Sequence, residues 1–372
     1  MPTTQHIQSS GARRRTPLSN LLISIGVAAT AVVAIAIAPV HEGASILRTN
    51  PAAAASGVAS QRPYTYGWPV APFNEQHPVR GHFADPRTTF DGPPTLSGLL
   101  TSGGSFSFHQ GIDISAPDGT AVYPVMDGIV KTVTNEWIQV DSDNGHAFQY
   151  WHVGAQVRVA DHVKAGSTIL GRILHGAEHV HLTELLNGLP VNPLAAGHIG
   201  PYTDTSTPEV TSISFRASDT GPQLLPDFLH GRVELVAAAA DTQTMLAPGI
   251  WRALPVSPAK ITFRIERIIP KPARIVVSET VARDVSQRLP QSGILWSQYA
   301  RGTHMNMPNF GSHRYWRQPG VYLFKLTAAP FDTKRLHDGI YRITVTAADT
   351  AGNHGSASQI FSVHNAKNWM KG

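Results

Sequence analysis

Histidine and aspartate side chains stand at metal-binding spacings in three short stretches of this sequence. The first pairs His109 with Asp113, the second is a His-x-His pair at His179 and His181, and the third is an apolar run that ends in His152. Side chains alternate between the two faces of an extended segment, so the members of each pair would point the same way. Because imidazole nitrogens and carboxylate oxygens suit zinc, these residues predict a strand-borne zinc site.

Other kinds of metal site do not fit this sequence. The chain has no cysteine, which excludes both disulfides and cysteine-ligated zinc. It also has no His-Glu-x-x-His, so the helix-borne plan of many zinc peptidases is absent. With 18 histidines, each spacing taken alone is expected roughly once by chance, so the neighbouring residues must support the assignment.

The neighbours of the first pair are consistent with a buried strand that carries a site on one face. Ile112 and Ile114 alternate with Asp113 and would point into a core. Gly111 lies between His109 and Asp113, where the missing side chain would leave space for a bound ion or substrate.

Taken together, the three stretches resemble the lysostaphin-type (LytM-type) zinc metallopeptidases, many of which cut peptide bridges in bacterial cell walls. That family has His-x-Gly-x-Asp followed by Ala-Pro-x-Gly-Thr-Pro-Val, then Tyr-x-His-Leu, then His-Leu-His-Phe-Glu. The matching stretches here are residues 109–122, 150–153 and 179–184, and the likeness extends over about residues 68–195.

The resemblance implies a role for each of five residues. His109, Asp113 and His181 would hold one zinc ion per chain, and His152 and His179 would be catalytic. Three protein ligands leave a position for water, whose pKa zinc lowers to about 7, and a neutral histidine can accept its proton. The implied activity is a zinc metalloendopeptidase acting on peptidoglycan cross-links or on another extracellular peptide.

The sequence departs from the family pattern beside the second pair of histidines. Leu182 and Thr183 stand where the family has Phe-Glu, and Glu184 comes one residue late. Thr183 shares a face with His181 in a regular strand, so we expect it to support that ligand less well than a carboxylate does.

Two other functions are compatible with the same residues. A non-catalytic cell-wall-binding or hydrolase-activator module of the same fold is one alternative, although such proteins usually lose ligand residues and none of the five is lost here. The other alternative makes the C-terminal region an adhesion or wall-binding domain attached to a relict enzyme. Metal content distinguishes the zinc metalloendopeptidase from both alternatives.

Several further charged and histidine residues are expected to be structural. For Arg87 we favour a solvated loop residue over a residue that holds a substrate carboxylate. The histidines expected on the surface or in loops are His77, His82, His162, His175 and His198.

The N-terminal segment has the features of an export signal. Three arginines at positions 13–15 precede residues 21–39, which contain no charged residue. A secretory h-region has about 7–15 apolar residues and a membrane span about 20, and this run lies between them. We therefore expect residues 1–40 to be a signal peptide or membrane anchor and residues 41–62 a flexible linker. The rest of the chain would be secreted, periplasmic or anchored at the cell surface, meeting the membrane only through an uncleaved segment. A buried core helix is the alternative.

The remaining chain predicts an all-β protein with two domains. With 42% hydrophobic and 15% charged residues the composition is globular, and 32 glycines and 28 prolines favour short strands joined by turns. We expect an antiparallel β-sheet metallopeptidase domain over residues 63–205, which would fold alone, and an immunoglobulin-like β-sandwich over residues 206–365. Residues 336–353 resemble the last hairpin of bacterial immunoglobulin-like domains. Strands in the first domain are expected at 121–125, 128–133, 137–140, 147–152 and 168–170.

The charge of the chain does not indicate a nucleic-acid partner. The formal net charge is +5, but residues 1–50 contribute four arginines and only one glutamate. The rest of the chain is therefore weakly basic and has no stripe of Lys and Arg with interleaved aromatic residues.

Overall fold

A computed structural model of the chain describes five segments. They are residues 47–49, 65–89, 105–290, 298–306 and 319–365. The predicted signal or anchor segment lies outside the described residues, as does most of the predicted linker. Within the described segments, no helix is both long enough and apolar enough to cross a membrane. The described residues all lie within Gly43–Gly372, which forms one compact unit.

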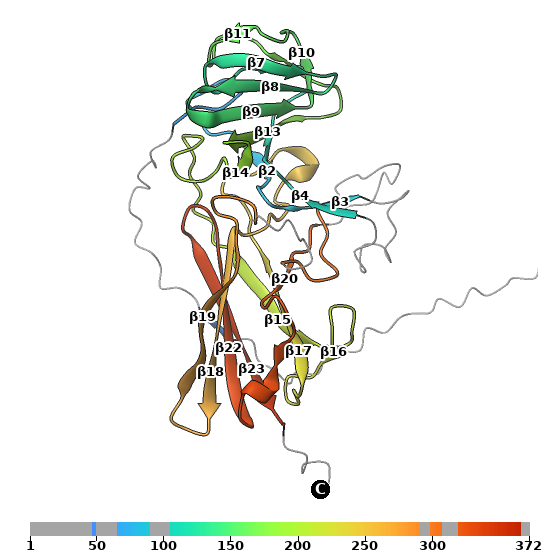
Figure 1. Cartoon of the computed structure of the whole chain (residues 1–372), viewed down its shortest axis with the longest axis vertical. Helices are drawn as coiled ribbons and strands as arrows, with labels where there is room; N and C mark the ends of the chain where they lie inside the picture. Colours follow the sequence, from blue (N-terminus) through green and yellow to red (C-terminus); the bar gives the residue numbers. More distant parts are fainter. Residues whose placement is uncertain (1–46, 50–64, 90–104, 291–297, 307–318, 366–372) are drawn as a thin grey trace, which may run out of the picture. The chain divides into compact units, whose positions relative to one another are not determined.

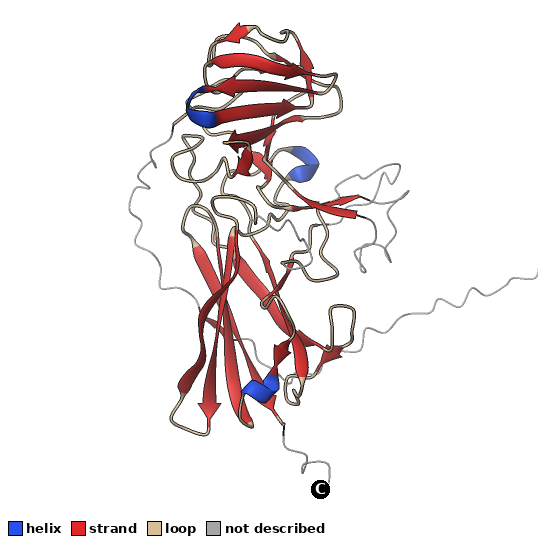
Figure 2. Ribbon diagram, in the orientation of Figure 1, coloured by secondary structure: helices blue, strands red, loops and turns tan. Residues whose placement is uncertain are grey.

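The described residues form β-structure almost throughout, which confirms the predicted fold class (Figure 2). Helix is confined in these residues to single 3-10 turns such as Asp143–Gly145. All the ladders between the named strands are antiparallel, as expected for a chain whose strands are joined by short turns.

The main sheet of the N-terminal region contains the strands that carry the predicted site (Figure 1). Its order is β11 (His162–Val163), β7 (Gly128–Val133), β8 (Trp137–Ser142), β9 (His146–Trp151), β13 (His179–Leu186), β5 (Ile112–Ser115) and β2 (Val79–Gly81), with β14 (Leu189–Val191) also paired to β13. Asn187 and Gly188 join β13 to β14 with φ angles of 52° and 78°. Positive φ at both positions of a two-residue loop is the requirement of a type I′ hairpin.

Two smaller sheets complete this region. The three-stranded sheet has the order β10 (Val153–Ala155), β12 (Gly171–Ile173) and β6 (Ala121–Val122), and β3 (Pro86–Thr89) pairs with β4 (Ser105–Phe108). The strand predicted at residues 168–170 is wrong, because β12 begins at Gly171. A turn precedes it, in which the Thr168 amide donates to the Lys164 carbonyl, and of the three residues only Leu170 is buried in the core.

The C-terminal region consists of two sheets that share a core. One has the order β1 (Leu47–Thr49), β23 (His354–Val363), β22 (Gly339–Ala348), β18 (Lys260–Ile269) and β19 (Arg274–Asp284). The other has the order β16 (Gln223–Leu224), β15 (Glu209–Arg216), β17 (Arg232–Ala240) and β20 (Leu323–Lys325), with β21 (Phe331–Asp332) also paired to β17. The rings of Phe215 and Phe361, one from each sheet, are 5.2 Å apart. We propose that this two-layered region is the immunoglobulin-like domain, with its boundary after residue 205.

The last hairpin forms as its sequence predicts. β22 begins at Gly339 and β23 at His354, and the two are paired along their whole length. In the turn between them, the backbone N–H of Asn353 donates to Asp349 Oδ1 at 2.9 Å. An aspartate side chain that bonds nearby backbone in this way holds a tight turn.

Buried polar contacts join the two regions. Arg283 of β19 is 2% exposed, and its Nη2 donates to the Ala84 carbonyl at 2.9 Å. The same guanidinium donates to Ser257, whose backbone amide donates to Asp85 Oδ1 at 2.9 Å. Because buried polar groups need partners, these contacts hold the loop after β2 against the C-terminal region.

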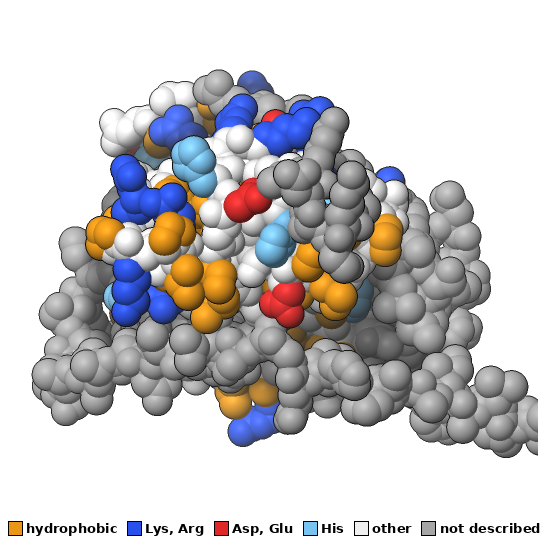
Figure 3. All heavy atoms as spheres, turned by 90° about the horizontal axis from the view of Figure 1, so that it is seen from below, with side chains coloured by type: hydrophobic (Ala, Val, Ile, Leu, Met, Phe, Trp, Pro, Cys, Tyr) orange, Lys and Arg blue, Asp and Glu red, His pale blue; other side chains and the backbone are white. Residues whose placement is uncertain are grey.

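Figure 3 shows how the charged side chains of the described residues are spread over one face of the molecule. In the view of Figure 3, the Lys and Arg side chains of the described residues are interspersed with apolar and histidine side chains. This agrees with the weakly basic charge of the chain beyond residue 50.

Candidate metal centre and active site

His109 and Asp113 reach the same point although they do not lie on one strand. His109 follows the end of β4 and Asp113 is the second residue of β5, so the predicted single extended segment is wrong. The chain bends at Gly111, where a Cβ would lie only 2.2 Å from the Leu182 carbonyl oxygen. The space that we assigned to an ion or substrate is therefore occupied by the backbone of β13, which only glycine allows to approach so closely.

His179 and His181 share one face of β13, as predicted. Antiparallel pairing places His181 opposite Asp113 of β5 on one side and opposite Trp151 of β9 on the other. Val180 between the two histidines is fully buried in the core. The apolar face of β13 thus fixes the strand in the sheet and directs both imidazoles to the opposite face.

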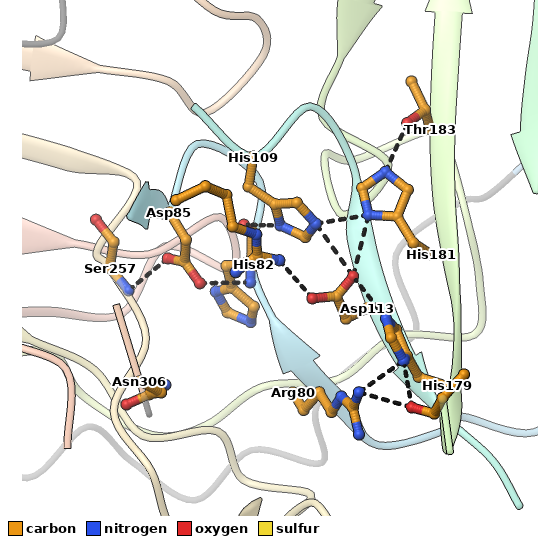
Figure 4. A network of polar contacts seen from close by, with 12 residues as sticks. Arg80, His82, Asp85, His109, Asp113, His179, His181, Thr183, Ser257 and Asn306 are labelled. Carbon is orange, nitrogen blue, oxygen red and sulfur yellow. Dashed lines mark hydrogen bonds and ion pairs between the residues drawn. The ribbon is translucent and has the colours of Figure 1, made fainter. Parts of the chain in front are cut away.

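Three potential ligand atoms converge on one point (Figure 4). His109 Nε2 lies 3.1 Å from Asp113 Oδ1 and 2.7 Å from His181 Nδ1, and His181 Nδ1 lies 3.0 Å from Asp113 Oδ1. Tetrahedral zinc with bonds of about 2.1 Å separates its ligand atoms by about 3.4 Å. The three side chains therefore need to move apart by only a few tenths of an ångström to surround such an ion.

The outer nitrogens of both histidines are held by hydrogen bonds. His109 Nδ1 donates to the His82 carbonyl at 2.7 Å, and His181 Nε2 donates to Thr183 Oγ1 at 2.8 Å. These contacts select the tautomers whose remaining nitrogens point at the centre. Thr183 thus shares a face with His181, as expected, and its hydroxyl is the acceptor that orients this ring.

The electrostatics of the site favour the protonation states that bind metal. Burial, reinforced by Arg87, lowers the pKa of His109 to about 3, and burial also lowers the pKa of His181. Burial alone would raise the pKa of Asp113, but His109 and Arg87 hold it well below its usual range. Neutral imidazoles and an ionised carboxylate are the forms that ligate zinc, so these residues fit the ion.

The hydroxyl of Thr183 can be tested without touching a ligand. Thr183→Val keeps the shape of the side chain but removes the acceptor for His181 Nε2. Zinc affinity is expected to fall by roughly 10–100-fold, as measured by competition with a chelator of known affinity. Thr211→Val, at an exposed position of β15, serves as the control. Equal zinc affinity in both variants would show that Thr183 does not support the ligand.

His152 and His179 form a second pair beside the three ligand atoms. Their ring centroids are 4.5 Å apart, and His179 Nε2 lies 3.5 Å from Asp113 Oδ1. His179 Nδ1 lies 2.6 Å from both the Ala177 carbonyl and Arg80 Nη2, so it donates to the carbonyl in one tautomer and accepts from the guanidinium in the other. Burial, together with the nearby His179, lowers the pKa of His152 to about 4, so His152 is neutral near pH 7.

Comparison with known proteins agrees with this geometry. Residues 107–193 match the sequence profile of peptidase family M23. This region belongs to peptidase family M23. The resemblance seen in the motifs is thereby confirmed for residues 107–193, hereafter the M23 region, which contains all five of the histidine and aspartate residues assigned to the site.

Several solved structures are similar to about a third of the chain. They include a SpoIIQ–SpoIIIAH pore-forming complex, at 18% identity over 37% of this chain and 93% of that chain, with a TM-score of 0.28. A zinc-containing peptidase from Vibrio cholerae has 21% identity over 35% of this chain and 39% of its own, with a TM-score of 0.26. A mutant catalytic domain of the prophage-encoded M23 protein EnpA from Enterococcus faecalis has 23% identity over 35% of this chain and 94% of its own, with a TM-score of 0.22. No curated protein matches the chain.

A cleft of about 430 Å³ opens over the five residues, and the M23 region supplies only part of its wall. Trp251 and Met305 of the C-terminal region line the same cleft, and the Arg80 guanidinium stacks 4.3 Å from the Trp251 ring centroid. Sequence reasoning did not identify these two residues, because they lie far along the chain and in no motif. Our expectation that Arg87 is a solvated loop residue is wrong, since it donates to Asp113 Oδ2.

The histidines that we expected to be structural are partly exposed and partly buried. His162 and His175 are exposed, as expected. His82 lies in a loop, as expected, but it is buried because the C-terminal region covers that loop, and Gln243 Nε2 contacts its Nε2 at 2.5 Å. His198 is half-buried, and its Nδ1 donates to Glu184 at 2.7 Å.

The burial of His82 predicts a pH dependence of stability. Burial lowers its pKa to about 4, against about 6.5 in an unfolded chain. As the pH falls, the unfolded state therefore gains the proton first. The contribution of neutral His82 to the free energy of unfolding is fully present above about pH 6.5, and about 3 kcal/mol of it is lost as the pH falls toward 4. When the free energy of unfolding is measured in urea between pH 4 and 7, His82→Gln is expected to make it depend less on pH. An unchanged dependence would contradict this assignment.

Proposed function

We propose that this chain is an exported zinc metalloendopeptidase that hydrolyses peptide bonds in cell-wall peptidoglycan cross-links. The observation that supports this most directly is the convergence of His109 Nε2, Asp113 Oδ1 and His181 Nδ1 on one point at a cleft. The peptidase family of the M23 region supports it further. Export rests on the sequence of residues 1–40.

His109, Asp113 and His181 would hold one zinc ion per chain. When bound, zinc polarises a substrate carbonyl and lowers the pKa of water to about 7. The three protein ligands leave the side facing the cleft for substrate and water, which is the plan of a catalytic rather than a structural zinc site.

His179 and His152 would perform the proton transfers. In the tautomer whose Nδ1 donates to the Ala177 carbonyl, His179 presents an unprotonated Nε2 on the ligand side and can accept a proton from the attacking water. His152 is neutral and adjacent, so its ring N–H can donate to the oxyanion that develops on the substrate. Arg80 donates to the Ala177 carbonyl at 2.9 Å and helps to hold the segment that orients His179.

The walls of the cleft suit an extended peptide that carries carboxylates. Trp151 and Trp251 offer flat apolar surfaces, whereas Arg80 and Arg87 contribute two guanidinium groups. Guanidinium groups bind carboxylates in a bidentate manner. Peptides of cell-wall cross-links present such groups.

Digestion of purified peptidoglycan tests the proposal. The wild-type chain is expected to create new amino and carboxyl termini within cross-link peptides, identified by mass spectrometry. Asp113→Ala should create none, whereas Asp227→Ala, at an exposed position, should cleave as the wild type does. If the wild type binds peptidoglycan and zinc but creates no new termini, the chain is a non-catalytic wall-binding or activator module and the proposal fails.

A further inference from the structure

Three aspartates that are distant in sequence converge at one end of the C-terminal strands. Asp204 lies before β15, Asp241 directly follows β17 and Asp349 directly follows β22. One carboxylate oxygen of each lies within 4.8 Å of those of the other two. The three residues are 7%, 3% and 9% exposed, so three acidic groups share a buried site.

The described contacts of these carboxylates do not balance their charge. Hydroxyl groups of Ser206 and Thr244 donate to Asp204 Oδ1 at 2.5 and 2.7 Å, and the Asn353 side chain donates to Asp349 Oδ2 at 2.7 Å. Among the described residues, no Lys or Arg forms an ion pair with any of the three. Buried carboxylates are normally paired with a cation or bound to a metal, and neutral donors alone leave them repelling one another.

One oxygen of the cluster lacks any partner. Asp241 Oδ1 accepts from the Thr242 amide at 2.8 Å, but the buried Oδ2 has no hydrogen-bond partner among the described residues. Burial and the neighbouring Asp204 and Asp349 raise the pKa of Asp241 to about 8. A buried carboxylate oxygen without a donor, on a residue whose carboxylate lies close to two others, points to a positively charged ligand.

We infer that Asp204, Asp241 and Asp349 bind a calcium ion. The three grouped residues are all aspartates, so the available ligand atoms are oxygens and none is a histidine nitrogen. Oxygen ligands favour a hard cation over zinc. Thr244 Oγ1, which bonds Asp204, is positioned to supply a neutral oxygen as well. Calcium accepts 6–8 oxygens in irregular geometry, as three separate loops would provide, whereas magnesium requires a near-ideal octahedron.

The proposed ion would connect loops on both sides of the predicted domain boundary. Asp204 ends the segment that leaves the M23 region, and its carbonyl already accepts from Asn353 Nδ2 at 2.9 Å. Asp241 and Asp349 belong to the two different sheets of the C-terminal region. Calcium is therefore expected to stabilise the folded chain, and this inference is independent of the proposed peptidase function.

The test is a calcium titration of the full chain after chelator treatment and reloading with one equivalent of zinc. Isothermal titration calorimetry is expected to show one calcium per chain, and the melting temperature should rise with the logarithm of calcium concentration. Magnesium at the same concentration should raise it less. The absence of saturable calcium binding at millimolar concentrations would overturn the inference, because the cluster would then share a proton instead.

Variants locate the site. Asp241→Asn keeps the shape and removes one charge, and it is expected to weaken calcium binding at least tenfold; Asp349→Asn should do the same. Asp227→Asn, at an exposed position, and Asp113→Asn, in the peptidase metal centre, should leave calcium binding unchanged. Wild-type affinity in both cluster variants would overturn the assignment. If one cluster variant does not fold, the other and the wild-type titration still decide the result.

Discussion

Replacing His179 with alanine is expected to abolish hydrolysis while zinc stays bound. His179 Nε2 lies beside the metal ligands, 3.5 Å from Asp113 Oδ1, but none of the three converging ligand atoms belongs to His179. Loss of a positioned proton acceptor lowers turnover by roughly 10²–10⁴-fold. The loss should appear mainly in kcat, because proton transfer occurs in the transition state and contributes little to substrate binding. Steady-state kinetics on a cross-link peptide, with metal analysis of the same preparation, measures both quantities.

His152→Ala should behave in the same way, because His152 lies beside His179 and offers its N–H to the developing charge. His175→Ala is the matched control, since His175 is fully exposed and belongs to the same region. Wild-type hydrolysis by either active-site variant, on a substrate that Asp113→Ala cannot cut, would mean that the histidine concerned is structural. The proposed mechanism would then be wrong, although the metal assignment would stand.

Asp113→Ala is expected to remove both zinc and activity. Asp113 supplies the only negative charge among the three converging ligand atoms, and its pKa is held low enough to keep it ionised. Without it, two neutral imidazoles remain, too few for a three-ligand catalytic site. Zinc content measured by mass spectrometry should fall from about one per chain to near zero, and hydrolysis should fall to background.

The comparison for this variant is Asp141→Ala, at a half-buried position of β8 in the same sheet. That variant should keep its zinc and its activity. His109→Ala and His181→Ala should match Asp113→Ala, because each removes one of the three converging atoms. Full zinc occupancy in all three ligand variants would refute the ligand assignment, even if their activity were lost.

Much of the candidate site could be predicted from the sequence because its features depend on residues that are close together in the chain. The alternation of apolar and polar residues in β13 places His179 and His181 on one face whatever the strand pairs with. Val180 and Ile112 belong to the core for the same reason. The turn chemistry of Asn187 and Gly188 likewise determines where β13 ends. These features depend on neighbours in the chain, which a sequence shows directly.

What the sequence did not show depends on long-range packing. The bend at Gly111 follows from the close approach of β13. Trp251 reaches the cleft only because the C-terminal region packs beside the M23 region.

The sequence by itself determined the β-rich class of the chain and was enough to propose the five candidate site residues. The tertiary structure alone decided which atoms face one another, including the buried contact of His82 and the convergence of Asp204, Asp241 and Asp349. The physical reason is that backbone conformation and side-chain alternation are local properties. Contacts between distant residues depend instead on how whole sheets and loops bury their surfaces against one another.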